Sequence, residues 1–482
     1  MSEAFLVIDA GSGSVKSFLI SPTGEILARS EREWNRDNWR SDTAWTKIQE
    51  SVTELMKLNQ CKVLGISSTS MREEFVLLDE NGKEVSYVLS EGSEKHGYKT
   101  LEAFGEAMYL SSGHWPVPNW IAGALLPWLQ ESGQLENAEH MLMISDWVNY
   151  KLCGEIATEG SSSCETSLYN IRENDWSWKL IDSLGLPREI FPDSVRNGEI
   201  IGYVPNEVSD SIEITEGTPV VIGGADTQCG LLGMGVFKGQ VGAVGGTTTP
   251  VQVVIDEPLF DPSMKTWTNN YLFDNLWILE SNVGYTGSIV RWIRDEKLGT
   301  SDYVELNSLA DRAPVGSDGV LSYLGPHLFD NSPPYWSVDK LGDLPVPSTI
   351  IGKNNDISCL TRSVIEANCY GVKANLNQLQ DIVNLDFDYL WFCGGNSKSD
   401  LWMQIQADVL GMEVRVPMVH DATAVGVAIL CGLGTDYFDN VTDAVVSMVR
   451  IGKLFEPRRL ESEAYQSHYR RWMETRDKLS RA

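Results

Sequence analysis

The chain has 482 residues, of which 42% are hydrophobic and 22% charged, and this globular composition excludes a disordered or fibrous protein. Its length favours two domains of roughly 200–250 residues over a single core. The net charge of −29 repels nucleic-acid phosphates and anionic membranes, so we expect neither as a partner.

Cysteine and histidine spacing argues against a metal or disulfide framework. The eight cysteines are scattered without a C-x-x-C spacing, and the six histidines form no H-E-x-x-H pattern. Neither a zinc site nor a disulfide scaffold is therefore predicted. There is no signal-peptide pattern and no apolar run of about 18 residues. Together these features predict a cytoplasmic protein.

The first half of the chain alternates between strand and helix patterns. Strands are expected at 5–8, 17–20, 26–30, 62–67, 75–78 and 84–88, the last two as a hairpin. Helical periodicity covers 43–57, 120–130 and 142–152. This alternation predicts an α/β fold.

A glycine-rich segment at 219–254 marks the middle of the chain. A strand is expected to end at Gly223, a helix to begin near Gln228, and new strands to flank Gly245 and Gly246. We place the domain boundary here, giving domains at 1–238 and 239–456. A charged helical tail is expected at 457–482.

The second half ends with the same alternation. Strands are expected at 389–393 and 414–416, and helices at 399–410 and 422–430. A turn at 394–396 joins the first strand to the first helix.

Two stretches resemble copies of one structural motif. Residues 7–14 and 243–250 each read as strand, glycine turn, strand, and such turns with exposed NH groups can form a nest for phosphate oxygens. One nest in each half suggests a duplicated domain that binds a polyphosphate between the copies. An ordinary glycine hairpin without a ligand remains the alternative.

Two common nucleotide motifs do not fit. A P-loop needs glycine directly before lysine, but Val15 precedes Lys16. Lys16 also occupies the last glycine position of a dinucleotide-binding pattern that starts at Gly11, and Lys238 does the same for the pattern starting at Gly233. A P-loop NTPase or an NAD-dependent dehydrogenase is therefore disfavoured.

Five motifs in order, from Asp9 to Ala428, carry a resemblance to a known family. They are Asp9-Ala-Gly-Ser-Gly-Ser-Val-Lys16, Gly223-Gly-Ala-Asp226-Thr-Gln228-Cys-Gly230, Gly245-Gly-Thr247-Thr248, Gly394-Gly-Asn-Ser-Lys-Ser-Asp-Leu-Trp402 with Gln406-Ala-Asp408, and Asp421-Ala-Thr-Ala-Val-Gly426-Val-Ala428. In this combination the chain resembles the FGGY carbohydrate kinases of the actin and hexokinase superfamily. Within that family, Ser70-Met-Arg-Glu73, Met143-Ile-Ser-Asp-Trp147, and Gly287 before Arg291-Trp-Ile-Arg-Asp295 look most similar to autoinducer-2 kinases.

The resemblance implies both a fold and an activity. The fold would be two actin-like (ribonuclease H-like) domains with the active site in the cleft between them. The activity would be ATP-dependent phosphorylation of a hydroxyl on a small carbohydrate, polyol or sugar-like metabolite, with Mg²⁺. Alternatives that stay open are an autoinducer-2 (dihydroxy-pentanedione) kinase specifically, and a non-catalytic actin-like sensor. A homodimer is also left open.

The resemblance assigns two acidic residues to the chemistry. Asp226 would be the catalytic base and would contact substrate and metal; the alternative is a cap for the helix that follows. Asp9 ends an apolar strand and would bind Mg²⁺ through water; the alternative is a turn-forming side chain.

The nucleotide-binding residues are likewise implied by the resemblance. Phosphate-binding residues would be Ser12, Gly13, Lys16, Gly246 and Thr247, and the rest of the nucleotide pocket would take Gly287, Arg291, Gly394, Gly395 and Asn396. Gly13 stands where many relatives have Thr, and Lys16 where many have Arg. These changes remove a hydroxyl and a bidentate fork but keep the backbone NH and the charge.

The substrate site departs from the family. Arg72 and Glu73 resemble the pair that binds substrate hydroxyls in glycerol kinases, although a surface ion pair is the alternative. Many relatives carry D-x-R after the position of Val88, where this chain has Ser90-Glu-Gly-Ser-Glu94. Glu91 is a candidate replacement for the missing acid. The substrate therefore cannot be copied from xylulose or glycerol kinases.

Overall fold

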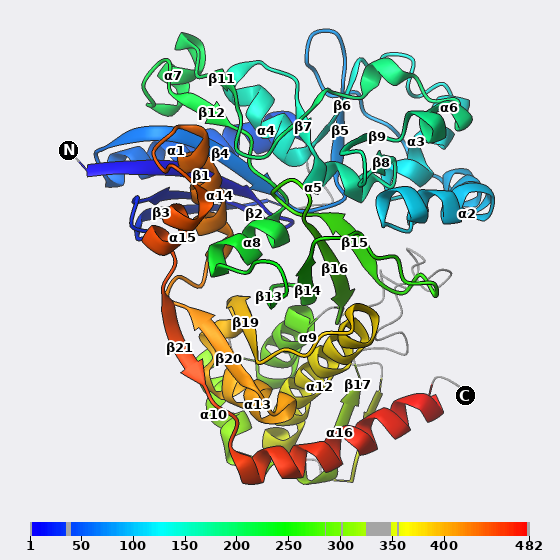
Figure 1. The fold of residues 1–482 in the computed structure, drawn as a ribbon, viewed down its shortest axis with the longest axis vertical. Coiled ribbons are helices and arrows are strands. Elements are labelled where there is room, and N and C mark those ends of the chain that lie inside the picture. Colours follow the sequence, from blue (N-terminus) through cyan, green and yellow to red (C-terminus); the bar gives the residue numbers. More distant parts are fainter. Residues whose placement is uncertain are drawn as a thin grey trace.

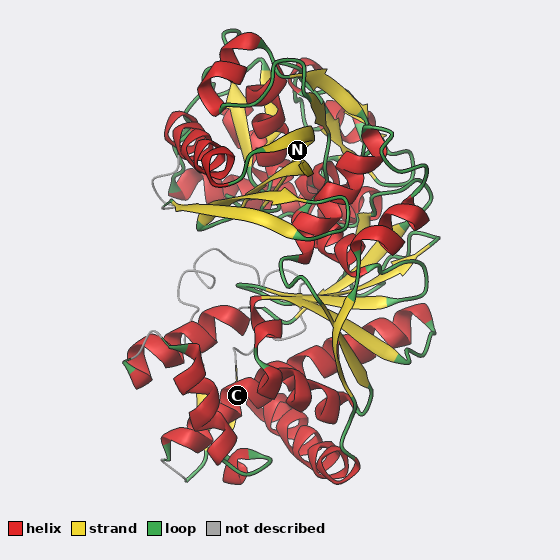
Figure 2. Ribbon diagram, turned by 90° about the vertical axis from the view of Figure 1, so that its left-hand side faces the viewer, coloured by secondary structure: helices red, strands yellow, loops and turns green. Residues whose placement is uncertain are grey.

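The computed structural model describes residues 2–34, 40–284, 286–299, 302–323, 349–353 and 356–479. Two mixed β-sheets organise these residues, each covered by helices (Figure 1). The six-stranded sheet has the order β11-β12-β4-β1-β2-β3, and the seven-stranded sheet has the order β15-β16-β14-β13-β19-β20-β21. We refer to residues 2–234 as the N-terminal half and to 241–479 as the C-terminal half. Figure 2 shows these halves one above the other.

The strands of the first sheet all come from the N-terminal half. They are β1 (Ser2–Ala10), β2 (Ser14–Ile20), β3 (Ile26–Glu33), β4 (Cys61–Ser70), β11 (Ile200–Tyr203) and β12 (Pro219–Val221). The helices of this half are α1 (Ser41–Leu58), α2 (Glu91–Ser112), α3 (Ala122–Glu131), α4 (Ile144–Cys153), α5 (Gly160–Ser163), α6 (Trp178–Ser183), α7 (Asn206–Ile212) and α8 (Asp226–Met234).

The strands of the second sheet all come from the C-terminal half. They are β13 (Val241–Gly245), β14 (Pro250–Ile255), β15 (Trp267–Asn270), β16 (Trp277–Asn282), β19 (Tyr389–Gly394), β20 (Glu413–Pro417) and β21 (Ile451–Phe455). The helices are α9 (Thr286–Trp292), α10 (Tyr303–Arg312), α12 (Ile357–Val383), α13 (Asp400–Leu410), α14 (Ala422–Gly434), α15 (Val441–Met448) and α16 (Arg459–Leu479).

Each sheet is built around the same strand arrangement. β1 runs antiparallel to β2 and parallel to β4, and β13 runs antiparallel to β14 and parallel to β19. In both sheets a glycine turn therefore joins the first two strands, at the end where the parallel neighbour also finishes. This repetition places two equivalent turns, one in each half.

Helices α8 and α14 cross between the two sheets (Figure 1). The crossing is close because glycines meet backbone there: a Cβ on Gly233 would lie 1.8 Å from the Ala422 carbonyl oxygen, and one on Gly426 would lie 1.9 Å from the Cys229 carbonyl oxygen. Their apolar residues share one core with side chains from both sheets, including Phe5. Although α14 lies between β20 and β21 of the second sheet in the chain, it packs on β1 and β4 of the first.

Two predicted elements are wrong in detail. The predicted hairpin of 75–78 with 84–88 forms only next to its turn, where the Val85 NH donates to the Leu77 carbonyl (2.8 Å) and a bridge joins Leu78 to Glu84, while β5 (Phe75–Leu78) pairs along its whole length with β6 (His140–Met143). Consequently the helix predicted over 142–152 begins at Ile144, because the preceding apolar residues pair with β5. Tertiary strand pairing overrides the local pattern in both places.

The predicted tail forms α16, a helix that packs on the C-terminal half. Its Tyr465 and Trp472 are fully buried, and the Trp472 indole donates to the Ser322 carbonyl (2.9 Å). No helix in the described ranges is long and apolar enough to cross a bilayer. The domain limits 1–238 and 239–456 stay a prediction.

Candidate active site

Asp226 lies at the first residue of α8, directly after the turn that follows β12. The N-cap position is Ala225, so Asp226 does not cap the helix in that way. Its half-buried carboxylate accepts a hydrogen bond from the Thr227 backbone NH (2.8 Å), and its carbonyl accepts one from the Thr423 hydroxyl of α14 (3.1 Å). The α8–α14 crossing therefore holds the backbone from which this carboxylate projects.

The surroundings of Asp226 make its carboxyl group a weaker acid than usual. Burial raises the pKa of Asp226 to about 6; the positive charge of Arg72 opposes this shift, and the negative charge of Asp9 adds to it. A carboxylate with this pKa is ionised at neutral pH and remains basic enough to accept a proton.

Asp9 and Lys16 face each other across the turn between β1 and β2. They are cross-strand partners, and their charged atoms lie 4.0 Å apart. Burial raises the pKa of Asp9, Lys16 partly offsets this rise, and the nearby charge of Asp421 adds to it. Lys16 is in turn stabilised in its charged form, since Asp9 raises its pKa.

Ser12 and Gly13 form the exposed end of the same turn. Trp34 closes one side of it: the indole NH donates to the Gly11 carbonyl (2.9 Å), and the backbone NH donates to the Gly13 carbonyl (3.0 Å). With the carbonyls held in this way, the turn has a defined shape and remains open on its other side.

The equivalent turn of the second sheet contains the exposed Gly246 and Thr247. The Gly287 NH at the start of α9 donates to the Thr247 carbonyl (3.1 Å), and a Cβ at Gly287 would lie 2.1 Å from the Gly246 carbonyl oxygen. Only glycine fits this contact. Arg291 lies one helical turn further along α9 and is exposed.

Gly394 is the last residue of β19, Gly395 and Asn396 follow it, and all three lie against the end of β13. Gly394 has a φ of +87°, and a Cβ there would lie 2.4 Å from the Gly245 carbonyl oxygen. The buried Asn396 side-chain NH₂ has no hydrogen-bond partner among the described residues. The structure thus brings together the predicted residues of the second glycine turn, α9 and the 394–396 turn.

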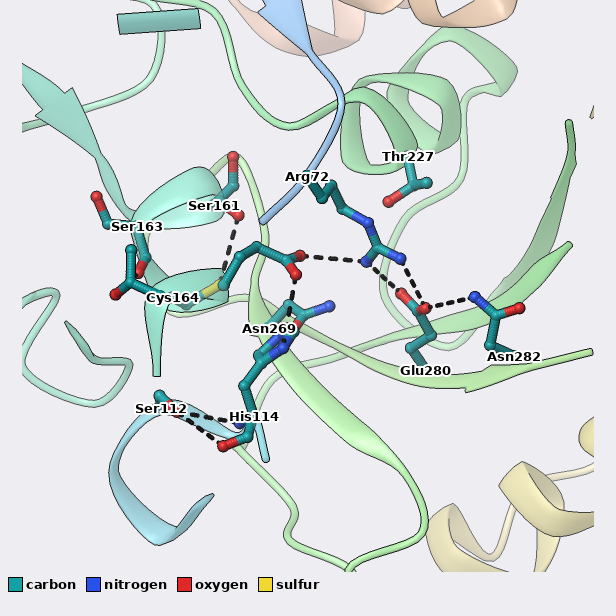
Figure 3. Close-up of polar contacts among 12 residues, drawn as sticks. Arg72, Ser112, His114, Ser161, Ser163, Cys164, Thr227, Asn269, Glu280 and Asn282 are labelled. Atoms are coloured by element: carbon teal, nitrogen blue, oxygen red, sulfur yellow. Dashed lines mark hydrogen bonds and ion pairs between the residues drawn. The ribbon is translucent and has the colours of Figure 1, made fainter. Parts of the chain in front are cut away.

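Arg72, between β4 and β5, joins acidic residues from both halves of the chain (Figure 3). It donates through Nη1 and Nη2 to both carboxylate oxygens of Glu280 on β16 (2.7 and 2.9 Å), and through Nη1 to Glu165 (3.1 Å). The Arg72 side chain is 11% exposed and both glutamates are fully buried. The predicted alternative of a surface ion pair is therefore wrong. Glu73 follows with a left-handed φ of +72°.

A second layer of polar side chains surrounds these ion pairs. The Gln252 NH₂ donates to Glu280 (2.7 Å), and His114 contacts Asn269 on one side and Glu165 on the other, with Nδ1 3.5 Å from Oε2. Burial and the Arg72 charge lower the pKa of His114 to about 3, so the imidazole is neutral. Burial raises the pKa of Glu165 well above its usual value, whereas Arg72 and Gln252 keep the pKa of Glu280 low.

His114, Cys164 and Glu165 also form a group whose ligand atoms all lie within 4.8 Å of one another, close enough to hold a metal ion. The sequence had predicted no such cluster. However, the Arg72 guanidinium already binds Glu165, and the Cys164 thiol contacts the Ser161 carbonyl (3.4 Å). Burial raises the pKa of Cys164, so the thiol is protonated. The adjacent positive charge disfavours a cation here.

The segment that departs from the family pattern, Ser90–Glu94, forms the start of α2. Ser90 is the N-cap, and its hydroxyl accepts from the Ser93 NH (3.3 Å). Glu91 is 81% exposed at the side chain and pairs with Lys95. The suggestion that Glu91 replaces the missing acid is therefore wrong, since its carboxylate is on the surface and committed to that pair.

Four residues around Arg72 were missed from the sequence: His114, Glu165, Gln252 and Glu280. Glu280 had a usable signal, because a charged residue within the apolar strand Trp277–Asn282 requires a buried partner. Glu165 lies in a 3₁₀ turn at Cys164–Thr166, and His114 follows the end of α2; neither position has a periodic pattern that marks it.

Comparison with known proteins agrees with this geometry. The model of the FGGY family of carbohydrate kinases matches with its N-terminal domain at residues 4–233 and with its C-terminal domain at 241–435. The chain belongs to this family. It is therefore a phosphotransferase that takes ATP as a substrate and an alcohol group as acceptor.

Similar proteins cover nearly the whole chain. The autoinducer-2 kinase of Enterobacter sp. (strain 638) is 28% identical over 97% of this chain and 93% of its own, and that of Klebsiella pneumoniae is 29% identical over 97% and 92%. Among solved structures, xylulose kinase from Lactobacillus acidophilus superposes with a TM-score of 0.86 at 18% identity, covering 99% of this chain and 98% of its own. Gluconate kinase from the same organism has a TM-score of 0.84 at 18% identity, covering 100% and 99%.

Proposed function

We propose that this FGGY kinase transfers the γ-phosphoryl group of ATP to a hydroxyl of a small polyol or sugar-like metabolite, with Asp226 as the general base. Asp226 would accept the hydroxyl proton as the new O–P bond forms and the bond from the γ-phosphorus to the β–γ bridging oxygen breaks, releasing ADP. The observation that carries this proposal is the pKa of Asp226, about 6, in a carboxylate whose charge interacts with both Arg72 and Asp9.

The nucleotide would bind between the two glycine turns. We assign the phosphates to Ser12, Gly13, Lys16, Gly246 and Thr247, and the remaining nucleotide contacts to Gly287, Arg291, Gly394, Gly395 and Asn396. The close backbone contacts at Gly287 and Gly394 support this assignment, since side chains there would displace the turns. The orphan NH₂ of Asn396 supplies a donor for a nucleotide oxygen or nitrogen.

Asp9 and Asp226 fit a Mg²⁺ ion. Burial raises the pKa of both carboxyl groups, and each carries charge near the other, so a divalent cation would stabilise their ionised forms. Bound with ATP, Mg²⁺ would neutralise charge on the phosphates. Few protein ligands suffice, because Mg²⁺ keeps several waters.

The acceptor site would be built on Arg72, Glu73 and Asp226. Relatives named autoinducer-2 kinase support dihydroxy-pentanedione as a specific acceptor. The missing D-x-R pattern and the surface position of Glu91 argue for a site that differs from that of many relatives.

A non-catalytic sensor is the second candidate function, and the only feature that favours it is the altered segment Ser90–Glu94. A cytoplasmic location and a homodimer stay predictions.

The decisive experiment measures ADP release with Mg-ATP against a panel of acceptors. The panel contains glycerol, erythritol, ribitol, xylulose, ribulose, fuculose and linear dihydroxy-pentanedione. We expect turnover with at least one compound, and Asp226→Asn should lower kcat by about 10²–10⁴-fold while ATP binding is retained. Turnover with the pentanedione alone would identify an autoinducer-2 kinase. Silence across the panel with ATP still bound would contradict the kinase proposal in favour of the sensor.

A further inference from the structure

The Arg72 network, which we define as Arg72, His114, Glu165, Gln252 and Glu280, engages both Nη atoms of its one arginine with protein carboxylates. Both Nη atoms are committed: Nη1 to Glu165 and Glu280, and Nη2 to Glu280. Glu280 is ionised, since Arg72 and Gln252 hold its pKa low. The cation of the network therefore already has a full counter-charge before any acceptor binds.

The far side of the network contains two facing polar atoms that share one proton. Glu165 Oε2 and His114 Nδ1 lie 3.5 Å apart, are buried, and have no hydrogen-bond partner among the described residues. Two such lone pairs repel each other unless a proton lies between them. The lowered pKa of His114 keeps the imidazole neutral. The pair thus adds no positive charge to the network.

The groups around the acceptor site are then mainly acidic. Glu73 and Asp226 lie near Arg72 together with Glu165 and Glu280. The charges of Glu73, Asp226 and Glu280 raise the pKa of Glu165, and those of Glu165, Glu280 and Asp226 raise the pKa of Arg72. A carboxylate on an acceptor would meet these acids with no uncommitted cation in the network to balance it, whereas a hydroxyl can both donate and accept.

We propose that Glu165, His114 and Glu280 determine acceptor specificity: the two glutamates supply the counter-charge of Arg72, His114 holds Glu165 in place, and the site therefore selects a neutral, hydroxyl-bearing acceptor and rejects the corresponding carboxylic acid. The proposal rests on the proposed function, because the acceptor is the compound phosphorylated there. Glu165 and Glu280 are fully buried, so they act as positioning residues through Arg72. Glu280 comes from the C-terminal half and Glu165 from the N-terminal half, so the arginine is fixed relative to both.

The test compares matched neutral and acidic ligands by calorimetry. The full-length protein, with Mg²⁺ and a non-hydrolysable ATP analogue, is titrated with three pairs: erythritol and erythronate, ribitol and ribonate, and glucitol and gluconate. We expect the wild type to bind at least one polyol, and to bind its acid about tenfold or more weakly. Glu165→Gln and Glu280→Gln, which remove a carboxylate but keep the shape, should reduce this ratio about tenfold.

A matched control uses another buried ion pair between an arginine and a glutamate. Glu366 accepts from Arg362 (2.9 Å), and both are buried in the C-terminal half. Glu366→Gln should lower stability and leave the polyol-to-acid ratio unchanged. His114→Gln provides a third network variant if one of the others fails to fold, and binding of the ATP analogue identifies folded proteins.

The outcomes separate the two proposals. Equal binding of acid and polyol by the wild type, an unchanged ratio in the folded network variants, or binding of none of the three polyols would overturn the specificity proposal. Selective polyol binding without ADP release in the panel assay would instead overturn the kinase proposal and leave the specificity proposal standing.

Discussion

At the scale of single residues, the chemistry depends on carboxyl groups whose acidity is set by position. Asp226, Asp9 and Glu165 all have raised pKa values, and burial is the largest cause for each. Glu280 is buried as well, yet its pKa is lowered, because Arg72 and Gln252 stabilise its ionised form. The acidity of a carboxyl group in this molecule therefore depends on its burial and on its charged partners.

The pKa of Asp226 leads to a prediction about pH. A general base acts only when ionised, so kcat/KM for Mg-ATP, which reports the enzyme before the metal and nucleotide bind, should rise with pH through about 6 and reach a plateau above it. Below that value kcat/KM should fall about tenfold per pH unit as the carboxylate is protonated. Initial rates at subsaturating Mg-ATP and saturating acceptor, measured from pH 5 to 8, would check this. Thermal stability over the same range is the control, and a flat profile would contradict the role of Asp226.

At the scale of secondary-structure elements, α14 supports the catalytic helix α8. Glycines let the two helices approach, and Thr423 of α14 donates to the Asp226 carbonyl. The helix comes from the C-terminal half of the chain but packs on the first sheet. The sequence motif that contains Asp421 and Gly426 is thus explained by contacts with the catalytic element.

Thr423→Val tests this support. Valine keeps the shape but removes the hydrogen bond, whose loss costs about 1 kcal/mol and corresponds to roughly a fivefold effect if it acts on kcat. We expect kcat to fall by that amount with little change in the KM for ATP. Thr423→Ser retains the hydroxyl and should behave like the wild type. If both variants lose activity equally, the hydrogen bond is not the cause.

At the scale of the whole molecule, the two halves are joined by more than the helix crossing. The Thr268 NH of β15 donates to the Gly113 carbonyl (3.1 Å), and Asn270 and Trp277 both donate to the Ile171 carbonyl (3.2 and 2.8 Å). The β15–β16 region of the second sheet therefore docks on the N-terminal half, next to His114 and Arg72. This docking brings Glu280 to the substrate side of the molecule.

Gly113 and Gly154 offer a matched test of this junction. Both end a helix with a left-handed φ, +76° and +83°, but a Cβ at Gly113 would lie 1.8 Å from the Thr268 carbonyl oxygen, whereas nothing lies within 4 Å of one at Gly154. Gly113→Ala should therefore lower the free energy of unfolding by about 1–3 kcal/mol more than Gly154→Ala. Calorimetric midpoints would show the difference, and equal losses would argue against close docking at β15.

The sequence by itself determined the family, the two glycine turns and the likeness between the halves, because these depend on short segments whose order along the chain is visible. Asp9 near the end of a strand, Gly395 in the turn after a strand and Asp226 after a strand all follow from local patterns, and the structure has them in such places. Local pattern failed at 84–88 and at 142–143, where pairing between β5 and β6 decides the conformation.

Only the tertiary structure decided how the substrate side is built. Arg72 meets Glu165 across 93 positions of sequence and Glu280 across 208, and β15–β16 must dock before these side chains can meet. The residues next to Arg72 in the sequence do not predict this pairing, because the partners are determined by how the folded surfaces pack and not by a periodic pattern. The same holds for the acidity of these groups: burial and facing charges set it, and both exist only once the two halves have packed together.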